Sequence, residues 1–246
     1  MADIMKRSCA VLALAVLALA IVPGAMAEYK VTSQTGEIYF PNENNWTYHF
    51  TYAYPRIEAE DYAAILINET FDEVLNEWAA LYLPMFADAP DMIFGEKNKV
   101  IHGFTVTCNN DRFFSVILTR SQPQDDTTVL TMEPLVFDVG GEYQGETLTL
   151  RGLVMVGESS GEISDAVLPV IWQEFLKLQE NGAALPDVTQ EQFYEAFSPM
   201  ENFYADQEGR AVFFIPPMLL TEPSFEPPAF AFSPAELEAL IASSAE

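Results

Sequence analysis

The run Gly157-Glu-Ser159-Ser-Gly161 has the residue types and spacing of the nucleophile elbow found in serine hydrolases. In that motif a sharp turn exposes a serine hydroxyl, and a histidine later in the chain takes its proton. Both histidines of this sequence, His49 and His102, come before the serine. The next helix is also expected to begin several residues after Ser159. A structural glycine–serine loop is therefore the preferred interpretation.

The two cysteines lack a pattern typical of catalysis. Cys9 lies in the N-terminal leader, so Cys108 would stand alone in the processed chain and no internal disulfide is expected. Cys108 ends the alternating run 104–108, which is typical of a strand with one buried face. His102 lies on the same face of this expected strand, six residues or roughly 20 Å away. We do not expect these two side chains to form a catalytic pair.

Acidic residues are abundant, but their spacing does not single out a metal or catalytic site. Asp88 with Asp91, or Asp125 with Asp126, could touch a calcium ion weakly, as chance pairs do in so acidic a chain. Zinc-binding spacings, EF-hand loops and phosphate-binding glycine loops are absent from the sequence. A carboxylate pair for glycoside hydrolysis stays open, because the separation it needs is spatial. We predict no catalytic, metal-binding or cofactor-binding residues, and the sequence favours a non-enzymatic protein.

The N-terminus has the three parts of a secretion signal. Lys6 and Arg7 form the positive end, an apolar run follows at 10–22, and Ala-Met-Ala at 25–27 is the pattern that a signal peptidase cleaves. The apolar run is shorter than the roughly 20 residues that a membrane-spanning helix needs. We therefore expect residues 1–27 to be removed and the processed chain to be periplasmic or secreted.

The net charge of the chain is −26, from 37 acidic and 11 basic residues. Such a charge repels nucleic-acid phosphates and anionic lipid head groups, so nucleic acid is not an expected partner. It favours basic partners, or it serves only to keep the protein soluble. After the leader no apolar stretch is long enough to span a bilayer, so stable membrane insertion is not expected once the signal is cleaved.

The first half of the processed chain is dominated by strand patterns around one long helix. An apolar stripe from Phe71 to Tyr82 marks this helix, which we place at 59–82 with Pro84 just beyond its end. Because short turns separate the later strands, antiparallel pairing is expected. The expected strands are 36–41, 46–55, 99–108, 112–120 and 127–139.

The second half alternates short helices and strands. Thr189 with Gln192, and Ser233 with Glu236, have the capping-box spacing that begins a helix. Other expected elements are a helix at 169–180 and strands at 147–150, on both sides of the turn 206–209, and at 229–232. The whole pattern predicts an α+β fold of antiparallel sheets with packed helices.

Three passages of the sequence share their order and spacing with one known family. They are Asn202–Pro217 with the helix start at 233–237, Pro55–Ile57 with Ile67–Asn68, and Phe137–Leu153. They resemble the RsiV-like extracytoplasmic domain family, which also occurs beside a polysaccharide deacetylase in PdaC-type proteins. The resemblance spans about residues 35–242, nearly all of the processed chain.

The resemblance implies two closely packed α+β subdomains, 28–125 and 126–246, with the loop 157–161 as a link between a short strand and a helix. In the anti-sigma factor of that family, the domain lies outside the membrane and binds lysozyme, which is a basic protein. This sequence departs from the family at Met218–Phe225, which replaces the tyrosines and the glycine of the family's proline loop.

Charge and resemblance together predict an exported, non-enzymatic binding domain for a basic protein such as lysozyme or for cell-wall glycan. Two alternatives stay open at this point. One is an envelope-acting hydrolase with an unidentified carboxylate pair, and the other is a structural accessory domain. The sequence predicts no particular binding residue for any of them.

Overall fold

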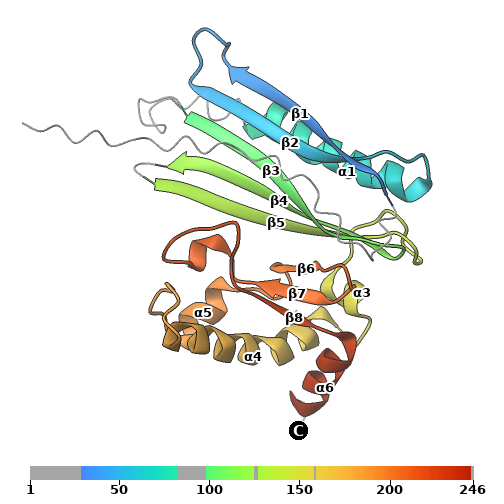
Figure 1. Cartoon of the computed structure of the whole chain (residues 1–246), viewed down its shortest axis with the longest axis vertical. Coiled ribbons are helices and arrows are strands. Elements are labelled where there is room, and N and C mark those ends of the chain that lie inside the picture. The colour runs from blue at the N-terminus through green and yellow to red at the C-terminus, as the bar shows by residue number, and fades with distance from the viewer. Residues whose placement is uncertain (1–28, 83–97, 125–126, 158, 245–246) are drawn as a thin grey trace, which may run out of the picture.

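The computed structural model describes residues 29–82, 98–124, 127–157 and 159–244. The described residues form two β-sheets and several helices (Figure 1), which confirms the α+β class. The predicted leader, residues 1–27, and Pro84 lie outside the described residues. Among the helices that are described, none is long and apolar enough to cross a membrane.

The larger sheet has five strands in the order β1-β2-β3-β4-β5. All neighbouring strands are antiparallel, as predicted, except β2 and β3, which are parallel. A parallel pair needs a crossover connection, and helix α1 (Tyr62–Glu77) lies between these two strands in the chain. The strands are β1 (Val31–Phe40), β2 (Tyr48–Ile57), β3 (Asn98–Asn109), β4 (Phe113–Gln124) and β5 (Thr127–Asp138).

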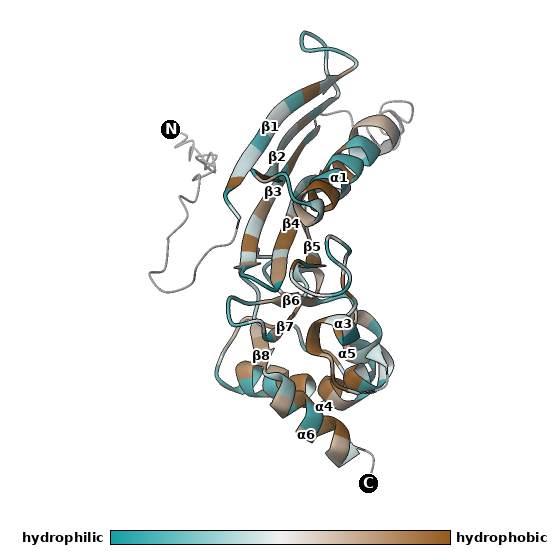
Figure 2. Cartoon of the chain, turned by 90° about the vertical axis from the view of Figure 1, so that its right-hand side faces the viewer, coloured by the Kyte–Doolittle hydropathy of each residue, from teal (hydrophilic) through white to brown (hydrophobic). Residues whose placement is uncertain are grey.

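Helix α1 packs against one face of this sheet (Figure 2). Asp61 caps its N-terminus by accepting a hydrogen bond from the backbone N–H of Ala64, and a π-helical turn, Trp78–Tyr82, continues from its C-terminus. The predicted apolar stripe is confirmed at Phe71, Leu75 and Trp78, which are buried. These side chains form the first core cluster with sheet residues that include Tyr48, Phe50, Val116 and Phe137.

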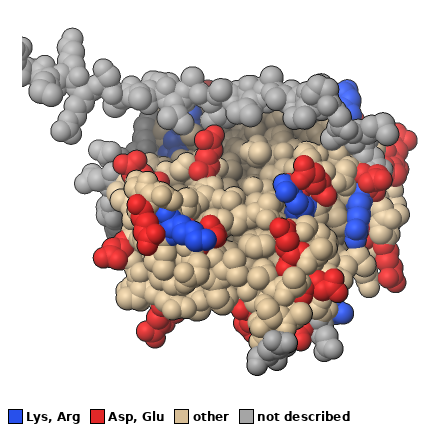
Figure 3. Space-filling model, turned by 60° about the horizontal axis from the view of Figure 1, so that its bottom comes forward, with Lys and Arg blue, Asp and Glu red and all other residues tan. Residues whose placement is uncertain are grey.

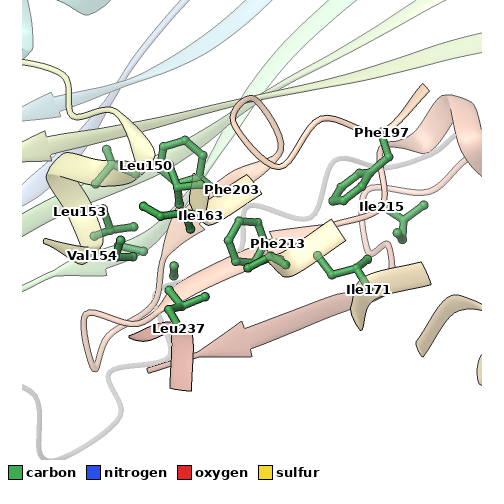
Figure 4. Close-up of a cluster of buried hydrophobic side chains, with 14 of the residues drawn as sticks. Leu150, Leu153, Val154, Ile163, Ile171, Phe197, Phe203, Phe213, Ile215 and Leu237 are labelled. Atoms are coloured by element: carbon green, nitrogen blue, oxygen red, sulfur yellow. The ribbon is translucent and has the colours of Figure 1, made fainter. Parts of the chain in front are cut away.

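The second sheet has three antiparallel strands in the order β6-β7-β8 and shares a core with the helices of the C-terminal half. Figure 4 shows Phe203, Phe213 and Ile163 inside this second cluster. Both predicted capping boxes begin helices, α5 and α6. The elements are α3 (Leu150–Val154), α4 (Ser160–Glu180), α5 (Gln190–Ala196), β6 (Phe203–Ala205), β7 (Ala211–Phe214), the 3₁₀ turn η3 (Pro217–Leu219), β8 (Ala229–Phe232) and α6 (Pro234–Ser244).

Two sequence predictions for the C-terminal half were wrong. Residues 147–150, predicted as a strand, contribute only an isolated bridge between Thr147 and Phe137 before α3 begins. Helix α4, predicted at 169–180, begins at Ser160 and contains Pro169. A proline inside a helix removes one hydrogen bond. Buried side chains on both sides of Pro169 compensate for this loss: Ile163, Val167, Ile171 and Phe175.

The chain passes from the larger sheet to the second part of the fold after β5. The family resemblance implied a division near residue 125. That position falls between β4 and β5 in the chain, and these two strands pair with each other along their whole length. The two parts also share their core. Cys108, Phe113 and Val136 belong to strands of the larger sheet, yet they pack in the second cluster.

Candidate functional site

Ser159 caps helix α4. Its side-chain oxygen accepts a hydrogen bond from the backbone N–H of Glu162 at 3.2 Å, and the Glu162 carboxylate accepts one from the backbone N–H of Ser159 at 2.8 Å. Gly157 has a φ of +73°, a conformation that side chains disfavour. Helix capping therefore explains the G-x-S-x-G pattern, and the helix begins directly after Ser159 rather than several residues later as predicted.

Cys108 is fully buried and lies on a different face of β3 from His102. The register of the β3–β4 pair shifts between Val106 and Cys108, and such a bulge reverses the faces of the residues beyond it. The prediction that Cys108 and His102 share a face was therefore wrong. Burial raises the pKa of the Cys108 thiol to about 12, so the thiol stays protonated near neutral pH.

His102 forms a buried pair with Tyr54 beneath helix α1. The Tyr54 hydroxyl and Nδ1 of His102 are 2.7 Å apart, and both side chains are more than nine-tenths buried. Burial, with a smaller contribution from the charge of Arg120, lowers the pKa of His102 to about 3. The imidazole is therefore neutral near neutral pH.

Aromatic rings surround the other side of this imidazole. Nε2 of His102 has no hydrogen-bond partner among the described residues, and the ring meets Phe50 and Trp78 edge-on, each with 4.6 Å between ring centroids. The guanidinium of Arg120 lies 4.6 Å from the centroid of the Trp78 ring. This packing is typical of a neutral core histidine, not of a general base that a substrate reaches.

His49 belongs to an aromatic group at the other end of β1 and β2. Its ring stacks on Tyr39 with 4.2 Å between centroids, and Trp46 lies beside it. The Glu37 carboxylate accepts a hydrogen bond from the Tyr39 hydroxyl at 2.6 Å and lies 3.2 Å from Nε2 of His49. These two contacts lower the pKa of Glu37, so this exposed carboxylate stays ionised.

The acidic pairs that could touch a calcium ion lie outside the residues that the structure describes. Asp88, Asp91, Asp125 and Asp126 all lie outside the described residues. Within the described ranges, no three histidine, cysteine or carboxylate side chains lie close enough together to hold a metal ion.

Residues that carry the family resemblance have structural roles. The Asn68 side-chain amide bonds to both backbone groups of Ile57, accepting from its N–H at 2.9 Å and donating to its carbonyl at 3.0 Å. The Asp138 carboxylate accepts hydrogen bonds from the backbone N–H groups of Gly141 and Tyr143 at 2.7 and 2.8 Å. These side chains hold α1 against β2 and shape the loop after β5.

A groove of about 180 Å³ lies between the two sheets. Strands β3, β4 and β5 provide one wall, and the other comes from β6, β7 and the chain that leads into β8. Ser115 joins the walls, because its hydroxyl oxygen accepts hydrogen bonds from the Thr107 hydroxyl at 2.8 Å and from the backbone N–H of Ala205 at 3.2 Å. The groove therefore depends on both parts of the fold.

The lining of the groove combines apolar walls with a few polar groups. Ile117 and Phe214 are buried, whereas Phe225 and Glu226 are exposed. Glu226 is the one charged side chain among the described residues that line it. Burial, with the charge of nearby Asp206, raises the pKa of the Tyr204 phenol, which therefore stays protonated. This combination suits a small ligand with an apolar body and a polar or positive end.

Solved structures identify the fold. A DUF3298 family member from Bacteroides fragilis matches with a TM-score of 0.54, over 87% of this chain and 99% of its own, at 11% identity. A DUF3298 family protein from Pseudomonas aeruginosa PAO1 matches with a TM-score of 0.55, over 85% and 92%, at 12% identity. This chain has the DUF3298 fold. No family model matches the sequence, and neither does any curated protein.

In this chain the fold assembles the groove from residues that the sequence did not predict as site residues. Thr105 on β3 and Phe225 before β8 line the same groove, although they lie in opposite halves of the chain. Alternating threonines in a strand and a phenylalanine in a proline-rich loop are common patterns, so neither indicates a site. The finer resemblance to the RsiV-like and PdaC-type proteins stays a prediction from the sequence.

Proposed function

We propose that this protein is exported and acts, in the periplasm or outside the cell, as an acidic binding domain for a basic protein such as lysozyme. The net charge of −26 carries the proposal, because a field of this size attracts cationic proteins and speeds their encounter. Removal of residues 1–27 is part of the proposal. The resemblance to the RsiV-like family supports it, since the anti-sigma factor of that family binds lysozyme.

The distribution of charge over the surface adds support. Figure 3 shows one face on which Asp and Glu outnumber Lys and Arg, and carboxylates lie beside the cations. Several of the protein's own cations already have carboxylate partners. Because acidic residues outnumber basic residues by 37 to 11, much of the negative charge remains available to a partner. These ion pairs are Lys30–Glu58, Arg56–Asp72, Lys177–Glu174 and Arg210–Asp206.

Calorimetric titration of the purified chain with lysozyme, over a series of salt concentrations, tests the proposal. A second small basic protein of unrelated fold serves as the control for charge alone. We expect lysozyme binding to persist at high salt, where attraction between exposed charges is screened, and binding of the control to disappear. Equal loss of both would show only non-specific attraction. No binding at any salt concentration would favour the wall-glycan, hydrolase or accessory-domain alternatives.

A further inference from the structure

We propose that the groove between the two sheets binds a single alkylammonium or guanidinium group, such as the side chain of a lysine or arginine on a partner protein. The identity of the partner rests on the proposed function. The chemistry of the groove does not, because the residues that line it and the charge of the chain support it without any particular partner.

The size of the groove fits one side chain. Its volume of about 180 Å³ is below the roughly 300 Å³ at which pockets for drug-sized ligands begin. Ile117, Met132 and Phe214 supply apolar surface on both walls. Methylene groups of lysine or arginine pack well on such surface while the charged end stays near water.

Charge determines which end group the groove accepts. Glu226 lines the groove and is exposed, and no described lysine or arginine lines it. An anionic ligand would meet the carboxylate of Glu226 and the charge of the whole chain, whereas a cation is attracted by both.

Aromatic rings and hydroxyl groups complete the fit to a cation. Phe225 and Tyr204 are aromatic residues of the groove lining, and a cation near an aromatic face gains about 0.5–1 kcal/mol at exposed sites. Thr105 is exposed, and Thr119, on the neighbouring strand, lines the groove beside it. Their hydroxyl oxygens can accept hydrogen bonds from an ammonium or guanidinium group.

Titration of the purified chain with small probes, followed by NMR, tests the groove without any protein partner. The probes are the Nα-acetyl methylamides of lysine and arginine, with that of norleucine as an uncharged control. We expect the cationic probes to shift the amide signals of Thr105 and Thr119, and norleucine to shift them far less. If N-acetylglucosamine trimer shifts these signals and the cations do not, the groove is a saccharide site and the proposal is wrong.

Four substitutions locate the effect. Glu226→Gln should weaken binding of the lysine probe roughly fivefold, the upper range for an exposed ion pair. Glu222→Gln removes the same charge from the same loop but outside the groove lining, so it should change binding little. Thr105→Lys places a cation in the groove and should abolish probe binding, whereas Thr105→Val removes only one hydroxyl acceptor and should weaken probe binding less. Equal effects of the two glutamate substitutions would overturn the proposal.

Lysozyme titrations of the same variants separate this inference from the proposed function. If lysozyme binds the wild type and Thr105→Lys equally, the groove does not anchor the partner, and the claim that it takes a protein side chain is wrong. If the probes bind but lysozyme does not, the groove chemistry stands and the proposed partner is wrong.

Discussion

Among single residues, His102 couples the fold most directly to pH. Its ring lies between Tyr54, Phe50 and Trp78, so protonation places a positive charge in an apolar layer. Arg120 on β4 pairs directly opposite His102, and its charge adds to the cost. The native state therefore holds His102 neutral at pH values where the unfolded chain binds a proton.

The expected result is a loss of stability in acid that depends on His102. The folded pKa of about 3 lies below the unfolded value of 6.5, so the contribution is complete above pH 6.5 and is lost as pH falls toward 3. In that window the free energy of unfolding of the wild type should fall, relative to His102→Gln, by up to about 1.4 kcal/mol per pH unit. Urea unfolding at several pH values measures the difference. Parallel stability curves for the two proteins would show that another group causes the acid sensitivity.

Between elements, the contact of β6 with β4 holds the two sheets together. Its central polar group is Ser115, which is fully buried and accepts the hydrogen bond from Ala205 on β6. The side-chain oxygen of Gln207 and its backbone carbonyl accept further hydrogen bonds from Asn109 and Asn110 at the end of β3. Backbone and side-chain hydrogen bonds thus hold the second sheet against the first.

Ser115→Ala should destabilise the protein by about 1–3 kcal/mol, because it leaves the buried N–H of Ala205 without its acceptor. Hydrogen exchange at the Ala205 amide should accelerate more than exchange at amides in the middle of β4. Ser121→Ala, on the same strand and less buried, is the matched control and should have little effect. A similar effect of both substitutions would mean that the Ser115 hydrogen bond does not hold the sheets together.

At the scale of the whole molecule, the two core clusters are linked by the strands of the larger sheet. Phe113 and Phe114 are neighbours on β4, yet Phe113 packs in the second cluster and Phe114 in the first. A strand presents successive side chains on opposite faces, so β3, β4 and β5 each contribute side chains to both clusters. Loss of one cluster therefore exposes the strands on which the other depends.

We expect the two parts to unfold in one cooperative transition. Trp78 lies in the first cluster and Trp172 in the second, so each reports on one part. After Trp46→Phe, either Trp172→Phe or Trp78→Phe leaves a single reporter. Within each variant, the urea midpoint of tryptophan fluorescence should coincide with that of far-ultraviolet circular dichroism. Separate midpoints in either variant would show that the parts unfold independently.

Local patterns in the sequence were sufficient for much of the secondary structure. The stripe from Phe71 to Trp78, the capping boxes at Thr189 and Ser233, and the strands around the turn 206–209 depend on residues close in the chain. The α+β class follows from these elements. Helix α4 shows the limit of such local patterns. Proline is unfavourable inside a helix, but Pro169 lies within α4 because side chains on both sides of it are packed in the core.

Only the tertiary structure decided which face of a strand each side chain occupies, which strands pair, and where the groove forms. One bulge after Val106 moves Cys108 to the opposite side of β3 from His102, and no sequence pattern marks it. The parallel pairing of β2 with β3 and the hydrogen bond from Ala205 to Ser115 join residues that lie far apart in the chain. Such contacts form only when the whole molecule packs. The sequence by itself determined a strongly acidic α+β chain, because charge and periodicity are local properties. It did not determine a site, because a groove between two sheets exists only after distant strands have met.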